Sequence, residues 1–175
     1  PTGACIPQAE KSAIYQLSLK HQFTIIEDDI YGDLGFYFST EPLKALDEQG
    51  NVILCSSFSK SLSRDLRVGW IMGGKHQAKI NHNKLVNQLS NNQAVQQGLA
   101  SFIAQGEYRR HLQYYRHRLQ QQRDQLIAAI NRYWQFSHQY TVPDGGLSVW
   151  LSLDKQIDTV AVYKKALAAN ITITP

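Results

Sequence analysis

A short apolar segment that leads directly into a lysine-containing turn constrains the fold more than any other part of this sequence. Val52-Ile53-Leu54-Cys55 is continuously apolar and follows Gly50-Asn51, a pattern typical of a buried strand in a parallel sheet. The residues after it are Ser56-Ser57-Phe58-Ser59-Lys60. Open α/β sheets bind their ligands at the carboxyl ends of the strands. Lys60 is therefore predicted to lie where such a sheet binds a ligand.

The residues around Lys60 favour a ligand that contains phosphate. Ser57 and Ser59 place hydroxyls just before the lysine, and Arg67 follows it. Arginine offers a planar fork of donors to a phosphate, and serine offers one short donor. A lysine beside an anchored phosphate is the outline of a site for pyridoxal 5'-phosphate (PLP), whose aldehyde forms a Schiff base with an amine. The segment alone leaves an alternative open, an ordinary strand-to-turn with a solvated lysine.

A second informative segment, Glu27-Asp28-Asp29-Ile30-Tyr31, follows a strand predicted at 23–26. An acid and a tyrosine three residues apart at the end of that strand can reach the same crevice as Lys60. A carboxylate facing a pyridine nitrogen keeps the nitrogen protonated and makes the ring a better electron sink. A tyrosine hydroxyl beside the ring oxygen can stabilise it. The alternative is a solvated acidic turn.

The spacing of apolar residues predicts alternating helices and strands. A helix and a strand, with a further strand after a loop, suggest a βα repeat in an α/β sheet. The predicted helices are 8–21, 43–48, 75–106 with a break at 90–92, 107–134 and 158–169, and the predicted strands are 23–26, 52–55, 68–72, 147–151 and 171–174.

The helix predicted at 107–134 contains no glycine or proline and carries one apolar stripe. Arginines lie between the residues of this stripe: Arg109, Arg110, Arg116, Arg118 and Arg123. We interpret them as a solvated helix surface, because glutamines and the apolar stripe dilute their charge. A nucleic-acid face and contacts with a partner subunit are the alternatives.

Composition restricts the class of protein. Hydrophobic residues make up 43% and charged residues 18% of the chain, a balance that supports a core. A net charge of +4 is too small to indicate nucleic-acid binding by itself. We expect no membrane span, no signal peptide and a cytoplasmic location. The two cysteines form no disulfide framework, the six histidines show no metal-ligand spacing, and the three tryptophans are expected in the core.

Four segments in a fixed order resemble one protein family. They are Pro1-Thr2-Gly3, Asp28-Asp29-Ile30-Tyr31, Ser57-Phe58-Ser59-Lys60 and Leu66-Arg67-Val68-Gly69-Trp70. Together they resemble the class I and II aminotransferases of PLP fold type I, most of all the branch fused to winged-helix DNA-binding domains, the MocR-type regulators of the GntR superfamily. The resemblance runs through essentially the whole chain. It implies a three-layer α/β/α large domain in which 68–72 is a strand inserted antiparallel to its neighbours.

The resemblance also implies a role for each candidate residue. Lys60 matches the lysine that forms the Schiff base with PLP and carries a proton between the substrate α-carbon and the cofactor. Asp28, three residues before Tyr31, matches the partner of the pyridine nitrogen, and Asp29 is the less favoured choice. Tyr31 matches the residue hydrogen-bonded to the ring hydroxyl. The phosphate ligands match Ser57 and Arg67, with Ser59 assisting.

The domain organisation implied by the resemblance has three parts. Residues 1–106 form part of the PLP-binding large domain, 107–134 a bridging helix, and 135–175 the start of a smaller α+β C-terminal domain. We expect a piece of a longer, homodimeric protein that takes an amino acid or amine as substrate or effector. DNA would be bound only through a domain outside this chain.

The sequence departs from the family pattern in ways that affect function. Ser63-Arg64-Asp65 stands where related sequences often have a Pro-Gly pair. The asparagine expected before Pro1, the phosphate-binding turn, the aromatic residue that stacks on the ring and the arginine for the substrate carboxylate have no counterpart in the chain. We therefore expect this chain alone to bind PLP weakly or not at all, and not to transaminate. Amino-group transfer and the sensing of PLP or an amino compound by a transcription regulator both stay open.

Overall fold

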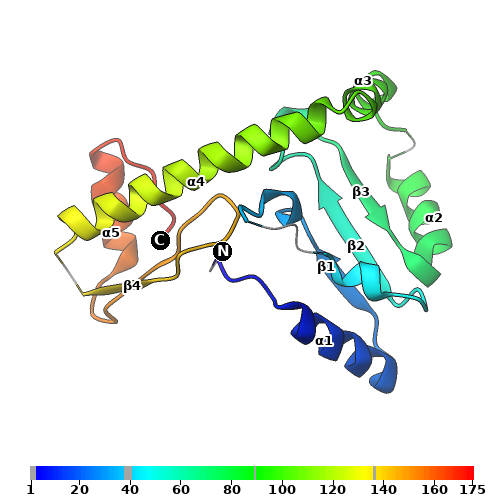
Figure 1. The fold of residues 1–175 in the computed structure, drawn as a ribbon, viewed down its shortest axis with the longest axis horizontal. Helices are drawn as coiled ribbons and strands as arrows, with labels where there is room; N and C mark the ends of the chain where they lie inside the picture. Colours follow the sequence, from blue (N-terminus) through cyan, green and yellow to red (C-terminus); the bar gives the residue numbers. More distant parts are fainter. Residues whose placement is uncertain (1–2, 38–40, 89, 136) are drawn as a thin grey trace.

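A mixed three-stranded sheet lies at the centre of the part of the chain that contains Lys60. The computed structural model describes residues 3–37, 41–88, 90–135 and 137–175, so Pro1 and Thr2 of the predicted motif lie outside the described residues. The strands β1 (Ile25–Asp28), β2 (Val52–Ser57) and β3 (Gly69–Met72) lie in that order (Figure 1). β1 and β2 are parallel, and β3 is antiparallel to β2. The predicted parallel strand at 52–55 and the predicted antiparallel strand at 68–72 are thus confirmed.

A long helix connects this sheet to a second part of the molecule. α4 (Glu107–Tyr133) has 27 residues and runs from the end of the sheet near α3 to the region of β4 and α5 (Figure 1). The other elements are α1 (Gln8–His21), η1 (Gly32–Leu34), η2 (Leu43–Leu46), η3 (Arg64–Leu66), η4 (Gly74–His76), α2 (Gln77–Gln88), α3 (Gln93–Ala104), β4 (His138–Tyr140), β5 (Leu151–Leu153) and α5 (Thr159–Ala168). Among the described residues, no helix is long and apolar enough to cross a bilayer.

One face of the sheet is covered and the other is largely open. Val52 is buried beneath α1 and η2, where Tyr15 and Leu43 complete the core, and Leu54 is also buried. On the opposite face Ile26 is 72% exposed. The chain exposes 12,684 Å² in all, whereas a compact protein of this mass exposes about 8,700 Å². Ile26 and Asp28 are both exposed on the second face, so the described residues leave this part of it uncovered.

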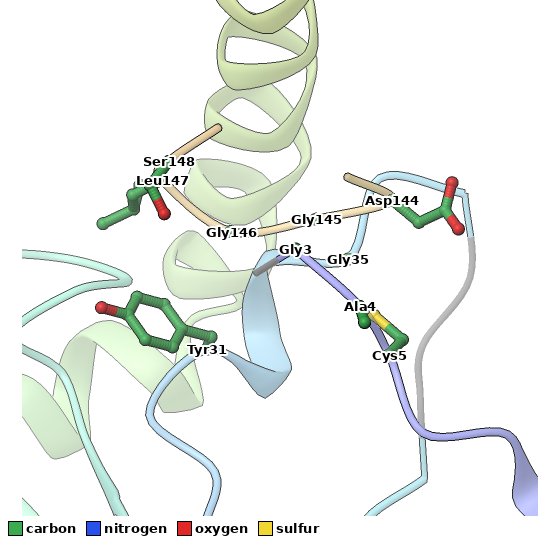
Figure 2. A pocket seen from close by; sticks show the side chains of 10 residues that line it. All are labelled: Gly3, Ala4, Cys5, Tyr31, Gly35, Asp144, Gly145, Gly146, Leu147 and Ser148. Carbon is green, nitrogen blue, oxygen red and sulfur yellow. The ribbon is translucent and has the colours of Figure 1, made fainter. Parts of the chain in front are cut away.

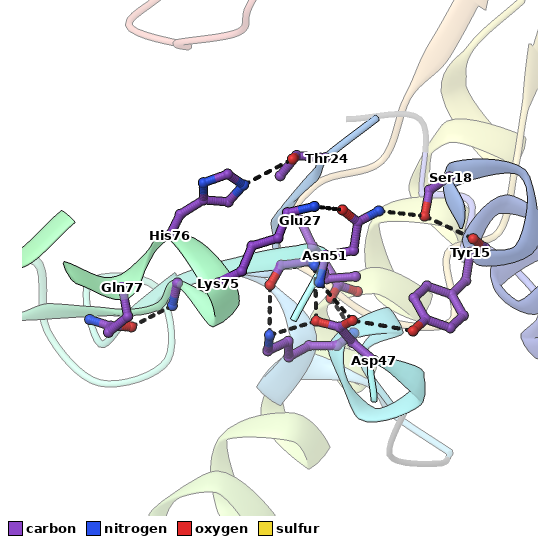
Figure 3. A network of polar contacts seen from close by, with 12 residues as sticks. Tyr15, Ser18, Thr24, Glu27, Asp47, Asn51, Lys75, His76 and Gln77 are labelled. Atoms are coloured by element: carbon purple, nitrogen blue, oxygen red, sulfur yellow. Dashed lines mark hydrogen bonds and ion pairs between the residues drawn. The ribbon is translucent and has the colours of Figure 1, made fainter. Parts of the chain in front are cut away.

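A buried polar network fixes where β2 begins (Figure 3). The Asn51 side-chain amide donates to Ser18 Oγ at 3.0 Å and to the Phe23 carbonyl at 2.7 Å. The Asp47 carboxylate accepts from the backbone N–H groups of Asn51 at 2.8 Å and Val52 at 2.9 Å. These bonds tie α1 and η2 to the first residues of β2. They thereby set the position of the turn that follows the strand.

Replacing Asp47 with asparagine is expected to destabilise the fold by about 1–2 kcal/mol at pH 7. Burial opposes ionisation of this carboxyl, but hydrogen bonds from Lys44 Nζ and from two backbone amides outweigh it and lower the pKa of Asp47 to about 2. A depressed carboxyl pKa stabilises the fold above about pH 4, and this stabilisation disappears as the pH falls toward 2. Chemical denaturation of the two proteins should therefore show a difference at pH 7 that shrinks in acid. Glu48→Gln, an exposed neighbour, is the matched control, and equal stabilities of Asp47→Asn and wild type at pH 7 would contradict the prediction.

Several sequence-based expectations are wrong in detail. The strand predicted at 147–151 is displaced, because only Leu151–Leu153 pairs, with His138–Tyr140. Residues 171–174 form no strand, since no described segment pairs with them. Trp70 and Trp150 are 41% and 49% exposed rather than in the core.

Candidate functional site

The end of β1 separates its two acidic residues onto opposite faces of the sheet. Glu27 points to the covered face, where its carboxylate accepts from the Leu43 and Lys44 backbone amides at 2.6 and 2.9 Å. Side chains alternate along a strand, so Asp28 lies on the open face. Its partner in the parallel register is Cys55, and Ser57, two residues further along β2, shares that face. The sheet therefore brings Asp28 and Ser57 to the same face and the same end.

Lys60 lies on a tight turn directly after β2. The Phe58 carbonyl accepts from the backbone amides of Leu62 at 2.9 Å and Ser63 at 3.0 Å, which closes the chain around Ser59 and Lys60. Lys60 itself is exposed, whereas the next residue, Ser61, is 1% exposed. The turn is thus anchored on its Ser61 side and presents the lysine outward.

The pairing of β2 with β3 places Ser57 opposite the segment that follows Arg67. Ser57 faces Gly69 in the register, and the Phe58 amide donates to the Val68 carbonyl at 3.1 Å. Arg67 has a φ of 52°, a left-handed conformation that costs a residue with a Cβ about 1–2 kcal/mol. In place of the Pro-Gly pair, Ser63 Oγ accepts from the Asp65 amide at 3.3 Å and begins η3. The segment therefore reaches Arg67 through a short 3-10 turn without a Pro-Gly pair.

The candidate side chains have no hydrogen-bonding or ionic partner among the described residues. Among the residues that the structure describes, none of them makes a side-chain hydrogen bond or an ion pair: Asp28, Tyr31, Ser57, Ser59, Lys60 and Arg67. Gly69 packs closely against this end of β2, because a Cβ there would lie 2.9 Å from the Ser56 carbonyl oxygen and 3.3 Å from Ser57 Cβ. Two cations, two hydroxyls, a phenol and a carboxylate are thus free to contact a ligand that carries a phosphate and a ring.

Asp29 is placed differently from Asp28. Its backbone amide donates to the Cys55 carbonyl at 2.9 Å, and its carboxylate packs against Gly32, where a Cβ would lie 2.2 Å from Oδ2. Burial, followed by the nearby charge of Glu27, raises the pKa of Asp29 to about 6. Asp29 is thus turned toward its own loop, whereas Asp28 is exposed on the open face.

Tyr31 borders a cavity of about 250 Å³. Figure 2 shows its ring together with the backbone of Gly3–Cys5, Gly35 and the segment Asp144–Ser148 around this space. The Phe36 amide donates to the Asp144 carbonyl at 2.8 Å, and the Gly146 amide donates to the Leu34 carbonyl at 3.0 Å. A segment beyond α4 is therefore bonded to the loop that carries Tyr31.

Arg123 contacts both the loop after Tyr31 and the segment around Asp144, and the expectation that it is solvated is wrong. It is 7% exposed rather than solvated. Its guanidinium donates to the Pro143 carbonyl at 2.6 Å and to the Tyr37 hydroxyl at 2.9 Å, and it lies 5.0 Å from the centre of the Phe36 ring. Gly145 packs so closely on this loop that a Cβ would lie 2.7 Å from the Leu34 oxygen. The residues Pro143-Asp144-Gly145-Gly146 are typical of a turn, but nothing in the sequence indicates which segment this turn contacts.

Comparison with known proteins shows the family of the chain. The sequence profile of the family "Aminotransferase class I and II" matches residues 1–175. The chain belongs to this family. Among curated relatives of this aminotransferase-like chain, the HTH-type transcriptional regulator YjiR of Escherichia coli is 34% identical over 99% of the chain and 37% of that protein. Aromatic-amino-acid aminotransferase 1 of Thermococcus litoralis is 29% identical over the whole chain and 42% of that protein.

Solved aminotransferases share the fold of this chain. The multiple substrate aminotransferase of Thermococcus profundus superposes with a TM-score of 0.92 at 26% identity, over 100% of this chain and 44% of that one. The α-aminoadipate aminotransferase LysN of Thermus thermophilus, complexed with N-(5'-phosphopyridoxyl)-L-leucine, gives 0.91 at 26% identity, over 100% and 46%. The fold is therefore that of the fold type I aminotransferases, and the chain spans about two fifths of the length of the curated relatives it matches.

Proposed function

We propose that the full-length protein binds PLP through this site and transfers an amino group between an amino acid and a 2-oxo acid. The observation that carries the proposal is that Ser57, Lys60 and Arg67 all belong to the segment at the carboxyl end of β2 and the start of β3, with no side-chain partners among the described residues. Support also comes from the LysN complex, which holds a phosphopyridoxyl compound in the same fold.

The residues present fit this cofactor. PLP supplies an aldehyde that condenses with amines and a ring that withdraws electrons from the adjoining carbon. Arg67 and Ser57, assisted by Ser59, would bind its phosphate through charge-assisted and hydroxyl hydrogen bonds. Lys60 Nζ would hold the cofactor through its aldehyde and would move a proton to or from the substrate α-carbon.

Asp28 and Tyr31, at the end of β1 and just after it, are the residues proposed to contact the PLP ring. The Asp28 carboxylate would keep a proton on the ring nitrogen, because an adjacent negative charge favours the protonated form. The Tyr31 hydroxyl would donate to the ring oxygen. The division into a large domain at 1–106, a bridging helix at 107–134 and a small domain at 135–175 belongs to the same proposal, as do a homodimer and a cytoplasmic location.

A second candidate function is favoured by the regulator relatives. YjiR, 34% identical, and the HTH-type regulator YisV of Bacillus subtilis, 31% identical, each match the chain over about 37% of their length. In this reading the same site binds PLP or an amino compound as a signal. DNA is then bound by a domain outside this chain, and sustained turnover is not needed.

One assay distinguishes the two functions. The full-length protein, loaded with PLP, is incubated with a panel of amino acids and a 2-oxo acid in excess over the protein. Amino-group transfer that exceeds one equivalent per site supports the enzyme. Binding of an amino compound without more than one equivalent of transfer, together with a change in DNA affinity, supports the regulator. A protein that neither binds PLP nor transfers an amino group contradicts both.

A further inference from the structure

The phenol of Tyr108 joins the two loops that carry the proposed site. Its hydroxyl oxygen lies 2.6 Å from Asp33 Oδ2 and 2.7 Å from Ser61 Oγ. Asp33 stands two residues after Tyr31, and Ser61 directly follows Lys60. Tyr108 itself belongs to the first turn of α4, which is separate from both loops in the sequence. One side chain of the long helix therefore bridges the loop of the phenol and the turn of the amine.

The chemistry of Tyr108, Asp33 and Ser61 determines which group donates each hydrogen bond of this bridge. A phenol has one hydrogen, so Tyr108 donates to the Asp33 carboxylate and accepts from the Ser61 hydroxyl. Burial, followed by the hydrogen bond to Asp33, raises the pKa of Tyr108 above its ordinary value. The phenol therefore keeps the hydrogen that the bridge needs throughout the ordinary pH range.

Neighbouring residues of α4 strengthen the same connection. The His111 ring nitrogen Nε2 donates to the Ser61 carbonyl at 2.9 Å, and Arg116 Nε donates to the Asp33 carbonyl at 2.7 Å. The Phe58 ring meets the Tyr108 ring edge to face, with centres 5.5 Å apart. Both the backbone and the side chain of Ser61 are thus held by α4. Because Ser61 is buried, its exposed neighbour Lys60 has little freedom to shift along the sheet.

We propose that Tyr108 is a positioning residue, which fixes the distance and orientation between Lys60 and Tyr31 by bonding to Ser61 and Asp33. The inference rests on the proposed function, because it matters only if Lys60 carries PLP and Tyr31 contacts its ring. Tyr108 does not touch the cofactor itself. Its effect is to hold the amine and the phenol ready, so that cofactor binding does not have to order them.

The test compares Tyr108→Phe with wild type in the full-length protein. The variant keeps the ring and its contact with Phe58 and removes only the hydroxyl. We expect the dissociation constant for PLP to rise about tenfold, which corresponds to about 1.4 kcal/mol and matches the net value of one or two hydrogen bonds. We also expect the visible circular dichroism per bound cofactor to change, because that signal reports how the ring is held. Loss of global stability alone changes neither quantity at temperatures well below unfolding.

Two further variants make the result decisive. Tyr114→Phe, on the same helix and 66% exposed, should behave as wild type. Ser61→Ala should weaken PLP binding and change the dichroism in the same direction as Tyr108→Phe, and combining the two should add little, since both remove the same bond. Unchanged affinity and dichroism in Tyr108→Phe, or losses that multiply fully in the double variant, would overturn the positioning role.

The outcome also separates this inference from the proposed function. Borohydride reduction fixes PLP to the amine that carries it, so peptide mass spectrometry identifies that amine in wild type. Labelling of Lys60 in wild type with an unaffected Tyr108→Phe variant rejects only the role of Tyr108. Absence of labelling at Lys60 in wild type rejects the proposed function, and the inference with it.

Discussion

Alanine in place of Lys60 is expected to abolish the borohydride-stable attachment of PLP to the full-length protein and to lower amino-group transfer by at least about 1,000-fold. The proposed amine both holds the cofactor and moves the α-proton, and proton transfer by a positioned group alone contributes about 100- to 10,000-fold. The visible absorbance of bound cofactor should disappear at the same time. Rates, absorbance and the site of labelling can all be measured on one preparation.

The matched control for Lys60 is another exposed lysine. Lys84 lies on α2 and makes no hydrogen bond or ion pair among the described residues, so Lys84→Ala should keep the labelling, the absorbance and the transfer rate. The Lys60→Ala variant should retain its fold, since Lys60 is exposed and its turn is closed by backbone bonds to the Phe58 carbonyl. Attachment of PLP to a different lysine in the wild-type protein would contradict the assignment.

The strands that carry the proposed site could be predicted because their signals are local. A continuous apolar run ending in Ser56 predicts a buried strand whatever surrounds it, and β2 is observed at Val52–Ser57. Ser57 pairs with Gly69, two residues after Arg67, because a short turn joins β2 to an antiparallel strand, so this placement follows from the spacing in the sequence. The acid and tyrosine of 28–31 follow from the end of a neighbouring parallel strand in the same way.

The contacts made by α4 could not be predicted, because they depend on which loops meet the helix. The apolar stripe of the helix places residues on one face but does not identify the residues that oppose them. Tyr108 bonds to Ser61 and to Asp33, which precede it in the sequence by 47 and 75 positions. Arg123 was expected on a solvated helix surface because glutamines and the apolar stripe dilute the charge of the arginines on this helix. It is buried because a carbonyl, a hydroxyl and two aromatic rings from distant segments surround it. The strand predicted at 171–174 fails for a related reason, since a strand needs a partner that sequence patterning does not supply.

Asp28→Ala is expected to lower amino-group transfer about 100- to 1,000-fold, whereas Asp29→Ala should cost less than about tenfold. The difference follows from the sheet. Asp28 shares the open face with Ser57 and has no hydrogen-bonding partner among the described residues, so its charge is available to a ring nitrogen. Asp29 packs on Gly32 beside its own loop. The ratio of kcat/KM values for the two variants measures this difference directly.

A charge-neutral pair of variants separates the role of the carboxylate from its size. Asp28→Asn should lose nearly as much activity as Asp28→Ala, because it cannot hold a proton on the ring nitrogen. Asp29→Asn should keep most of the activity and gain stability above pH 6. Burial raises the pKa of Asp29 to about 6, so the ionised form disfavours the fold and wild-type stability falls as the pH rises from about 4 through 6. Equal activity losses at the two positions would contradict the assignment of the ring-nitrogen role to Asp28. A stabilising effect seen only in Asp28→Asn would contradict the inference that burial of the ionised Asp29 destabilises the fold.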